Sequence, residues 1–415
     1  MPHTAELIAV GTELLLGSIA NTDGQFLSRE LAALGISVYH HTVVGDNPGR
    51  LRAAVEIAKG RADLIITTGG LGPTCDDLTK NVLAEAFGKT LVYNEEAARR
   101  MEDYFRRAGR EVTPNNYQQA YLPEGCVPFQ NDWGTAPGCG FEADGVRVIM
   151  LPGPPSECQP MFRERAVPYL RDWIDGTVFS RTLRIFGMGE SAVESLLRDK
   201  MNAMENPTLA PYAKEGEVEL RLTAKAPDVE AAQALIAPAE AELRGILGDL
   251  IYGTDEDNLE SVCLRLLKER GLTLSAAESC TGGLVAQRIT DLPGASAVFK
   301  GGVVSYWSQV KHEVLGVPRE FLDTYGAVSE PVARAMAQGV RRLTGSDLAV
   351  SVTGVAGPDP DDRGNPVGLV YVGIAWDGGD FVREVHATGP RGRVRRTAAS
   401  HAFDLARRKL TGLEL

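Results

Sequence analysis

The sequence lacks several features that would each define a class of protein. No apolar run approaches the ~20 residues of a membrane-spanning helix, and the opening Met-Pro-His-Thr-Ala-Glu lacks the basic and apolar stretches of a signal peptide. The six cysteines form no C-x-x-C pair, and the six histidines have no zinc-binding spacing. We therefore expect a cytoplasmic protein with reduced thiols, no dedicated zinc site and no membrane partner.

Positive charge is also in deficit. The chain has 43 Lys and Arg against 55 Asp and Glu, a net charge of -12. A nucleic-acid-binding protein needs basic surface to contact phosphates, so nucleic acid is not expected as a partner. At 415 residues the chain is too long for one ordinary core, and two or three domains are expected.

Residues 1–170 alternate strand and helix patterns. Apolar, β-branched runs predict strands at 7–10, 38–44, 64–67 and 146–151, and helical spacing predicts helices at 25–34, 48–58, 78–87 and 95–108. This order is typical of a doubly wound α/β domain with a mainly parallel sheet. Ligands in such sheets bind at the carboxyl ends of the strands, where this sequence has polar or glycine-rich turns.

The turn at residues 67–79 is the most informative of these. Gly69, Gly70 and Gly72 allow backbone N–H groups to approach an anion closely, and Asp76 and Asp77 follow where the next helix begins. Two acids would repel a bare phosphate, so a metal ion between acid and phosphate is the economical interpretation. The alternative is an ordinary turn in which one of the two acids caps the helix.

Residues 171–253 form a small split α+β unit that resembles KH-type modules. A KH nucleic-acid reader carries a basic G-x-x-G loop between two helices. Gly187-Met188-Gly189-Glu190 does not fit that loop, and residues 171–250 hold nine Lys and Arg against fourteen Asp and Glu. We expect a connecting domain rather than an RNA-binding one.

Residues 254–415 form a third domain, again α/β. The segment 278–283 is a strand-turn-helix corner whose backbone N–H groups suit a phosphate or carboxylate. Cys280 there is a candidate nucleophile, because a helix N-terminus lowers the pKa of a thiol. The alternative is a small buried cysteine, since no histidine is placed by the sequence to serve it. Lys311 is a second candidate, because a lysine kept neutral by burial can deprotonate a serine such as Ser296, with Tyr306 orienting the proton. The alternative is a solvated lysine on a helix surface. Arginines at 391–396 open the last helix and suit a phosphate, or form only a basic surface patch.

At these motifs the chain resembles the CinA family (competence/damage-inducible protein A) over its whole length. The first domain resembles the family's molybdopterin-binding-type domain in the segments 11–15, 69–77, 134–138 and 151–155. The last resembles its nicotinamide-nucleotide amidase domain in the segments 278–283, 301–306, 326–330 and 352–358.

The resemblance implies two activities and two sets of residues. The C-terminal domain would deamidate nicotinamide mononucleotide without a cofactor. Its catalytic residues would be Ser296, Tyr306, Lys311, Thr353 and Arg391, with Arg395 as the alternative to Arg391. Substrate would also contact Ser279, Thr281, Gly282, Gly283, Gly301, Gly302, Gly354 and Arg395, with one of the two glycine pairs stabilising the oxyanion or holding the phosphate.

The N-terminal domain would hydrolyse ADP-ribose with a divalent ion (Mg, Mn or Co) held by Asp76, Asp77 and Glu13. Its substrate-binding residues would be Gly11, Thr12, Gly69, Gly70, Gly72, Thr74 and Gly153. The family also implies a homodimer. Asp23 stands where the family often has asparagine, which puts one ligand contact in question. The competing hypothesis is a nucleotide- or pterin-binding scaffold linked to competence or DNA damage, without turnover at the N-terminal site.

Overall fold

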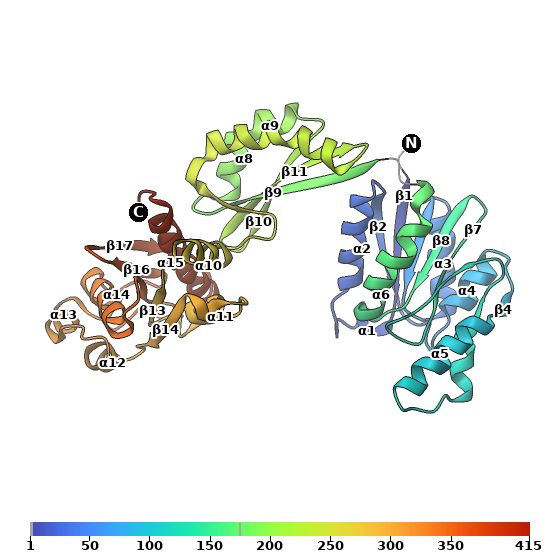
Figure 1. Ribbon diagram of the computed structural model, residues 1–415, viewed down its shortest axis with the longest axis horizontal. Helices are drawn as coiled ribbons and strands as arrows, with labels where there is room; N and C mark the ends of the chain where they lie inside the picture. Colours follow the sequence, from blue (N-terminus) through green and yellow to red (C-terminus); the bar gives the residue numbers. More distant parts are fainter. Residues whose placement is uncertain (1–2, 174–175) are drawn as a thin grey trace. The chain divides into compact units, whose positions relative to one another are not determined.

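The computed structural model describes residues 3–173 and 176–415 (Figure 1). Its contacts divide the chain into two compact units, residues 1–179 with 224–234 and residues 180–223 with 235–415. No helix among the described residues is both long and apolar enough to cross a bilayer. Residues 1 and 2, part of the segment in which no signal peptide was expected, lie outside the described ranges.

The N-terminal domain is built on a six-stranded sheet of order β2-β1-β3-β8-β7-β6. The first four strands are parallel, and β7 and β6 continue the sheet antiparallel, so the predicted doubly wound α/β fold is confirmed. The strands are β1 Thr4–Val10, β2 Ser37–Val44, β3 Leu64–Thr68, β6 Val127–Phe129, β7 Gly138–Ala143 and β8 Val146–Leu151; β4 Leu91–Tyr93 and β5 Tyr121–Pro123 form a separate pair.

Helices cover both faces of this sheet (Figure 1). Side chains alternate along each strand, so Ile8 and Val10 pack with helices α3 and α4, while Leu7 packs with α2 and α6 on the other face. The helices and helical turns are α1 Thr12–Leu15, α2 Thr22–Ala33, α3 Pro48–Lys59, α4 Thr79–Ala86, α5 Glu95–Arg107, η1 Pro114–Ala120, α6 Pro155–Met161, η2 Phe162–Ala166, α7 Val167–Tyr169 and η3 Arg171–Trp173.

The middle domain is a four-stranded sheet of order β10-β11-β9-β12 with two helices, the split α+β unit that the sequence predicts. Its elements are β9 Thr177–Ile185, α8 Glu190–Ala203, β10 Thr208–Lys214, β11 Glu217–Ala226, α9 Val229–Leu247, η4 Gly248–Leu250 and β12 Ile251–Thr254. The Gly187–Glu190 segment lies between β9 and α8, a strand and a helix, which is not the place of a KH-type nucleic-acid loop.

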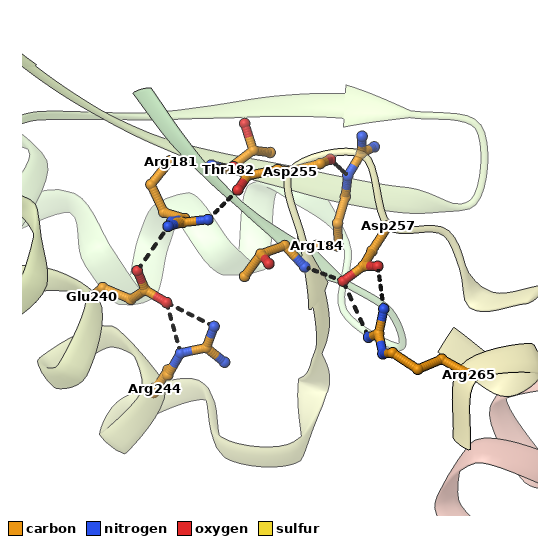
Figure 2. Close-up of polar contacts among 9 residues, drawn as sticks. Arg181, Thr182, Arg184, Glu240, Arg244, Asp255, Asp257 and Arg265 are labelled. Atoms are coloured by element: carbon orange, nitrogen blue, oxygen red, sulfur yellow. Dashed lines mark hydrogen bonds and ion pairs between the residues drawn. The ribbon is translucent and has the colours of Figure 1, made fainter. Parts of the chain in front are cut away.

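Ion pairs order the polar segment that leads from the middle domain into the C-terminal one (Figure 2). The carboxylate of Asp255, just after β12, accepts from Arg181 and from the Thr182 backbone N–H. Two residues on, the carboxylate of Asp257 accepts from the Thr254 N–H and from Arg265 in the following helix. The segment is therefore held to β9 on one side and to helix α10, Leu259–Arg270, on the other.

The C-terminal domain has a five-stranded sheet of order β14-β13-β15-β16-β17 in which the first three strands are parallel. Helices α10, α11 and α15 pack on one face and α14 on the other. The strands are β13 Leu274–Glu278, β14 Phe299–Val304, β15 Leu348–Gly354, β16 Leu369–Trp376 and β17 Gly379–His386; the helices are α10 Leu259–Arg270, α11 Leu284–Thr290, η5 Ala295–Ala297, α12 Ser308–Glu313, α13 Arg319–Tyr325, α14 Glu330–Thr344 and α15 Arg391–Thr411.

Candidate functional site

A cavity of about 570 Å³ lies at the carboxyl ends of β1, β3 and β8, where the doubly wound fold predicts a ligand. Of the predicted N-terminal residues, only Thr12 is not among those that line it; Thr12 Oγ1 instead donates to the carboxylate of Asp46, a lining residue, over 2.7 Å. The predicted residues that line the cavity are Gly11, Glu13, Gly69, Gly70, Gly72, Thr74, Asp76, Asp77 and Gly153.

Glycine is required in the turn after β3. Gly69 and Gly70 have φ values of 91° and 68°, which side chains rarely adopt. A Cβ on Gly69 would also collide with the carbonyl oxygen of Val10, and one on Gly70 would collide with Thr79. The backbone of this turn can therefore pack directly against the end of β1, where it lines the cavity.

The acid pair belongs to this turn and not to the helix. Helix α4 begins at Thr79, and its N-cap, Leu78, forms no side-chain cap. The carboxylate of Asp77 instead accepts from the N–H and hydroxyl of Thr74, at 2.8 and 2.6 Å. The alternative in which an aspartate merely caps the helix is therefore wrong.

The electrostatics of the cavity are one-sided. Six carboxylates line it and no lysine, arginine or histidine does, counting the described residues. Burial raises the pKa of two of them, Asp23 and Glu157. The carboxylates are Glu13, Asp23, Asp46, Asp76, Asp77 and Glu157.

These donors suit a hard divalent ion only if a ligand completes the site. No three Asp, Glu, His or Cys residues in the described ranges lie close enough together to hold a metal, so Glu13, Asp76 and Asp77 do not form a ready-made cage. Mg²⁺ is often held by one or two carboxylates together with substrate phosphates. A Cβ on Gly72 would lie 2.6 Å from the Asp77 carboxylate oxygen Oδ2, so only glycine at position 72 leaves room for that oxygen. Asp76 and Asp77 offer carboxylates of the kind that such a shared metal–phosphate site uses.

Sequence reasoning missed Gln119, another lining residue. Its side chain is 1% exposed, and both amide atoms lack a hydrogen-bond partner among the described residues. Its backbone is fixed, because the buried Lys80 ammonium donates to the carbonyls of Gln118 and Gln119 at 2.9 and 3.0 Å. Lys80 is 38 and 39 positions away from these two residues in the sequence, so no local sequence pattern predicts the contact.

In the C-terminal domain the buried lysine is bonded to a serine, but not to the expected one. Lys311 is 1% exposed, and its Nζ lies 2.8 Å from Ser279 Oγ and 2.6 Å from the Ser305 carbonyl oxygen. Burial lowers the pKa of Lys311 from 10.5 to about 8. A neutral amine at this place can accept the proton of Ser279.

The expected pairing of Ser296 with Lys311 is wrong. Ser296 is an exposed residue of η5, which precedes β14, whereas Lys311 lies in α12, which follows it. The six residues of β14 span ~20 Å. Ser296 lines a separate open cavity with no lysine, arginine or histidine among its described lining residues. Ser279, by contrast, directly follows β13 at the same sheet edge as Lys311.

Three other predicted residues lie around that edge. Thr353 is buried near the end of β15, and its hydroxyl donates to the Ala327 carbonyl over 2.7 Å. The Ser279 N–H donates to the carbonyl of the preceding residue of β15, Val352. Arg391 opens α15 and donates to the Tyr306 hydroxyl at 2.9 Å and the Gly357 carbonyl at 2.6 Å. Tyr306 thus contacts an arginine, where contact with the serine–lysine pair was expected.

The Gly282–Gly283 pair does not offer the free backbone donors expected of it. The N–H groups of Gly283, Val285 and Ala286 donate to the buried carboxylate of Glu278, so the start of α11 is already occupied by an anion. Gly301 and Gly302 lie inside the edge strand β14, in register with β13, and not in a turn. Gly354 ends β15, where a Cβ would collide with β16.

Cys280 is not set up as a nucleophile. It is 5% exposed, and burial raises the pKa of its thiol from 9.0 to about 11, which keeps it protonated at neutral pH. The carbonyls of Cys280 and Thr281 accept from the Arg395 guanidinium at 3.1 and 2.6 Å, so this arginine faces backbone.

Comparison with known proteins finds a family match for each domain. The CinA C-terminal domain matches residues 256–410, the probable molybdopterin binding domain matches residues 6–172, and the damage-inducible protein CinA KH domain matches residues 180–253. Solved structures include CinA from Thermoplasma acidophilum, described as of unknown function, at 33% identity and a TM-score of 0.38 over 41% of this chain and 99% of that one.

Full-length relatives resemble the whole chain. A CinA-like protein of Dictyoglomus turgidum is 49% identical over 408 residues, which cover 98% of this chain and 99% of the relative. A putative competence-damage inducible protein of Acetivibrio thermocellus is 47% identical over 410 residues, 99% of each chain. With three family domains in order and such relatives over its full length, this chain belongs to the CinA family.

Proposed function

We propose that the protein is a bifunctional hydrolase of pyridine-nucleotide recycling. The C-terminal domain deamidates nicotinamide mononucleotide to nicotinic acid mononucleotide and ammonia, and the N-terminal domain hydrolyses ADP-ribose to AMP and ribose 5-phosphate. The observation that carries the first activity is the buried hydrogen bond of 2.8 Å between Lys311 Nζ and Ser279 Oγ. A serine and a neutral lysine suffice for acyl transfer without histidine or metal.

In this mechanism Ser279 is the nucleophile. Its Oγ attacks the carboxamide carbon while Lys311 Nζ takes the hydroxyl proton, and the lysine then gives that proton to the departing ammonia. Water hydrolyses the acyl-enzyme with Lys311 again as base. Arg391, at the first turn of α15 and bonded to the Tyr306 hydroxyl, lies at the same end of the domain and suits the substrate phosphate.

The proposed amidase should be more active in alkaline solution. Lys311 acts as a base only when neutral, and burial lowers its pKa to about 8. We expect kcat/KM for nicotinamide mononucleotide to rise about tenfold per pH unit below this pKa and to level off above it. Ammonia release measured from pH 6 to 9.5 tests this. A profile that is flat across that range would contradict a lysine base.

The second activity is supported by the charge of the N-terminal cavity. ADP-ribose carries a pyrophosphate. A cavity whose described lining has six carboxylates and no basic residue repels it unless a cation intervenes. Asp76 and Asp77 are the residues proposed to hold a divalent ion, which would neutralise the pyrophosphate and activate water. The glycine turn after β3 would hold the phosphates by its backbone.

Removal of metal tests the N-terminal activity separately. We expect AMP release from ADP-ribose to fall to background in EDTA and to return with Mg²⁺, Mn²⁺ or Co²⁺, because an uncompensated acidic cavity excludes the substrate. Ammonia release from nicotinamide mononucleotide by the same preparation should not change, since no metal is proposed there. ADP-ribose hydrolysis that survives EDTA would contradict the proposed metal dependence. No hydrolysis with any of these metals would favour the scaffold hypothesis for this domain.

A further inference from the structure

The turn that carries Ser279 leaves a backbone donor beside the nucleophile from which no described group accepts. The N–H groups of Ser279, Gly282 and Gly283 donate within the fold, to Val352, Ser279 and Glu278 respectively. In this turn of the described chain, that leaves the N–H groups of Cys280 and Thr281. Of these two, the Cys280 N–H is the one that directly follows Ser279.

The orientation of that N–H follows from its peptide plane. In a trans peptide the carbonyl and the next N–H point in opposite directions. The Ser279 carbonyl accepts from Gly282 across the turn, so the Cys280 N–H points away from the inside of the turn. It lies one residue after the proposed nucleophile, where an N–H can stabilise the oxyanion of a tetrahedral intermediate.

Arg395 fixes the next two peptide units from the other side. Its Nε donates to the Cys280 carbonyl and its Nη2 to the Thr281 carbonyl, at 3.1 and 2.6 Å. The guanidinium makes these two contacts from two nitrogens held in one plane, whereas lysine offers a single nitrogen on a more flexible stem. Arg395 belongs to α15, a long helix packed in the main core of the domain, so the support is rigid.

We propose that Arg395 is a positioning residue that holds the 279–282 turn so that the Cys280 N–H acts as the oxyanion donor. The inference rests on the proposed amidase function and assigns to Arg395 a role other than binding substrate phosphate. An arginine that binds phosphate governs KM, whereas one that sets an oxyanion donor governs kcat.

Steady-state deamidation of nicotinamide mononucleotide by Arg395→Met and Arg395→Lys tests the inference. We expect Arg395→Met to lower kcat about 100-fold, within the range for loss of an oxyanion donor, with KM nearly unchanged. The kcat of Arg395→Lys should lie between those of the wild type and Arg395→Met. The Arg395→Lys variant provides the test if Arg395→Met does not fold. The matched control is Arg408→Met, which removes an arginine of the same helix that donates to a carbonyl far from the turn. A rise in KM alone, or an unchanged kcat, would overturn the proposal.

A second readout separates this inference from the amidase assignment. A fluorophosphonate probe labels an activated serine: Ser279 Oγ bonds to phosphorus, the P–F bond breaks, fluoride leaves, and Lys311 takes the serine proton. During this reaction negative charge develops on the phosphoryl oxygen, which the Cys280 N–H would stabilise as it would the oxyanion of the amide. If the wild type is labelled at Ser279 but does not deamidate the nucleotide, slower labelling of Arg395→Met still supports the inference while the proposed substrate fails. Equal labelling of both, or none in the wild type, would overturn it.

Discussion

Replacement of Ser279 by alanine is expected to abolish ammonia release from nicotinamide mononucleotide, lowering kcat by at least about 10³-fold. The variant removes the Oγ that lies 2.8 Å from Lys311 and leaves no hydroxyl for the buried amine to activate. Because Ser279 is nearly buried and alanine is smaller, no clash is introduced and the fold should persist. Near- and far-ultraviolet circular dichroism of the variant checks that it does.

Ser296→Ala is the matched control, because the two serines give opposite expectations. Ser296 is exposed in η5 at the far end of β14, so its loss should leave kcat and KM within about twofold of the wild type. If Ser296→Ala were inactive and Ser279→Ala active, the assignment made from the structure would be wrong. If both were active, the reaction would not proceed through either serine, and Lys311 would need another role.

The N-terminal cavity was largely predictable because its signal is local. Glycines with positive φ, a preceding buried strand and two acids all fall within the segment 64–77, so the turn and its place at a strand's carboxyl end follow from short-range chemistry. What could not be predicted is which residues from distant parts of the chain line the same cavity. Gln119 reaches the cavity through η1, which is held by Lys80 from 39 positions away.

The C-terminal site shows a different limit. Lys311 is predicted as the base, but pairing it with Ser296 for its closeness along the chain ignores which end of the strand each residue occupies. Ser296 precedes β14 and Ser279 follows β13, and in a parallel sheet only the latter lies at the ligand-binding edge. That topological rule was available from the sequence and would have selected Ser279.

The helix start at Gly282 and Gly283 was expected to bind an anion, and it does, but the anion is internal. Glu278 is 1% exposed and is one of the residues that form the turn, so its carboxylate takes three N–H groups before any substrate arrives. A glutamate at the end of a strand gives no hint in sequence that its side chain turns back onto the next helix. The conformation of the Glu278 side chain decides whether its carboxylate reaches these N–H groups, and a sequence pattern does not specify that conformation.

For the N-terminal domain, we expect the double variant Asp76→Asn and Asp77→Asn to lose about 10³-fold in kcat/KM for ADP-ribose, as removal of several kcal/mol of charge stabilisation implies. Asparagine keeps an oxygen that can accept from Thr74, which Asp77 does over 2.8 Å, so the turn should survive while its negative charge is lost. AMP release with saturating Mn²⁺ measures the effect.

The decisive comparison is between loss of negative charge inside the cavity and loss of negative charge elsewhere on the same domain. Asp144→Asn serves as the control, because Asp144 is an exposed residue of the same domain with a positive φ that asparagine tolerates. It should leave ADP-ribose hydrolysis unchanged, and both proteins should retain full amidase activity, since Ser279 and Lys311 lie in a separate domain. If the double variant kept its activity and its response to Mn²⁺, the ion would have to be held by other carboxylates of the cavity. Glu13 and Asp46 would then be the next pair to replace, because they line the same cavity from the neighbouring strand ends, after β1 and β2.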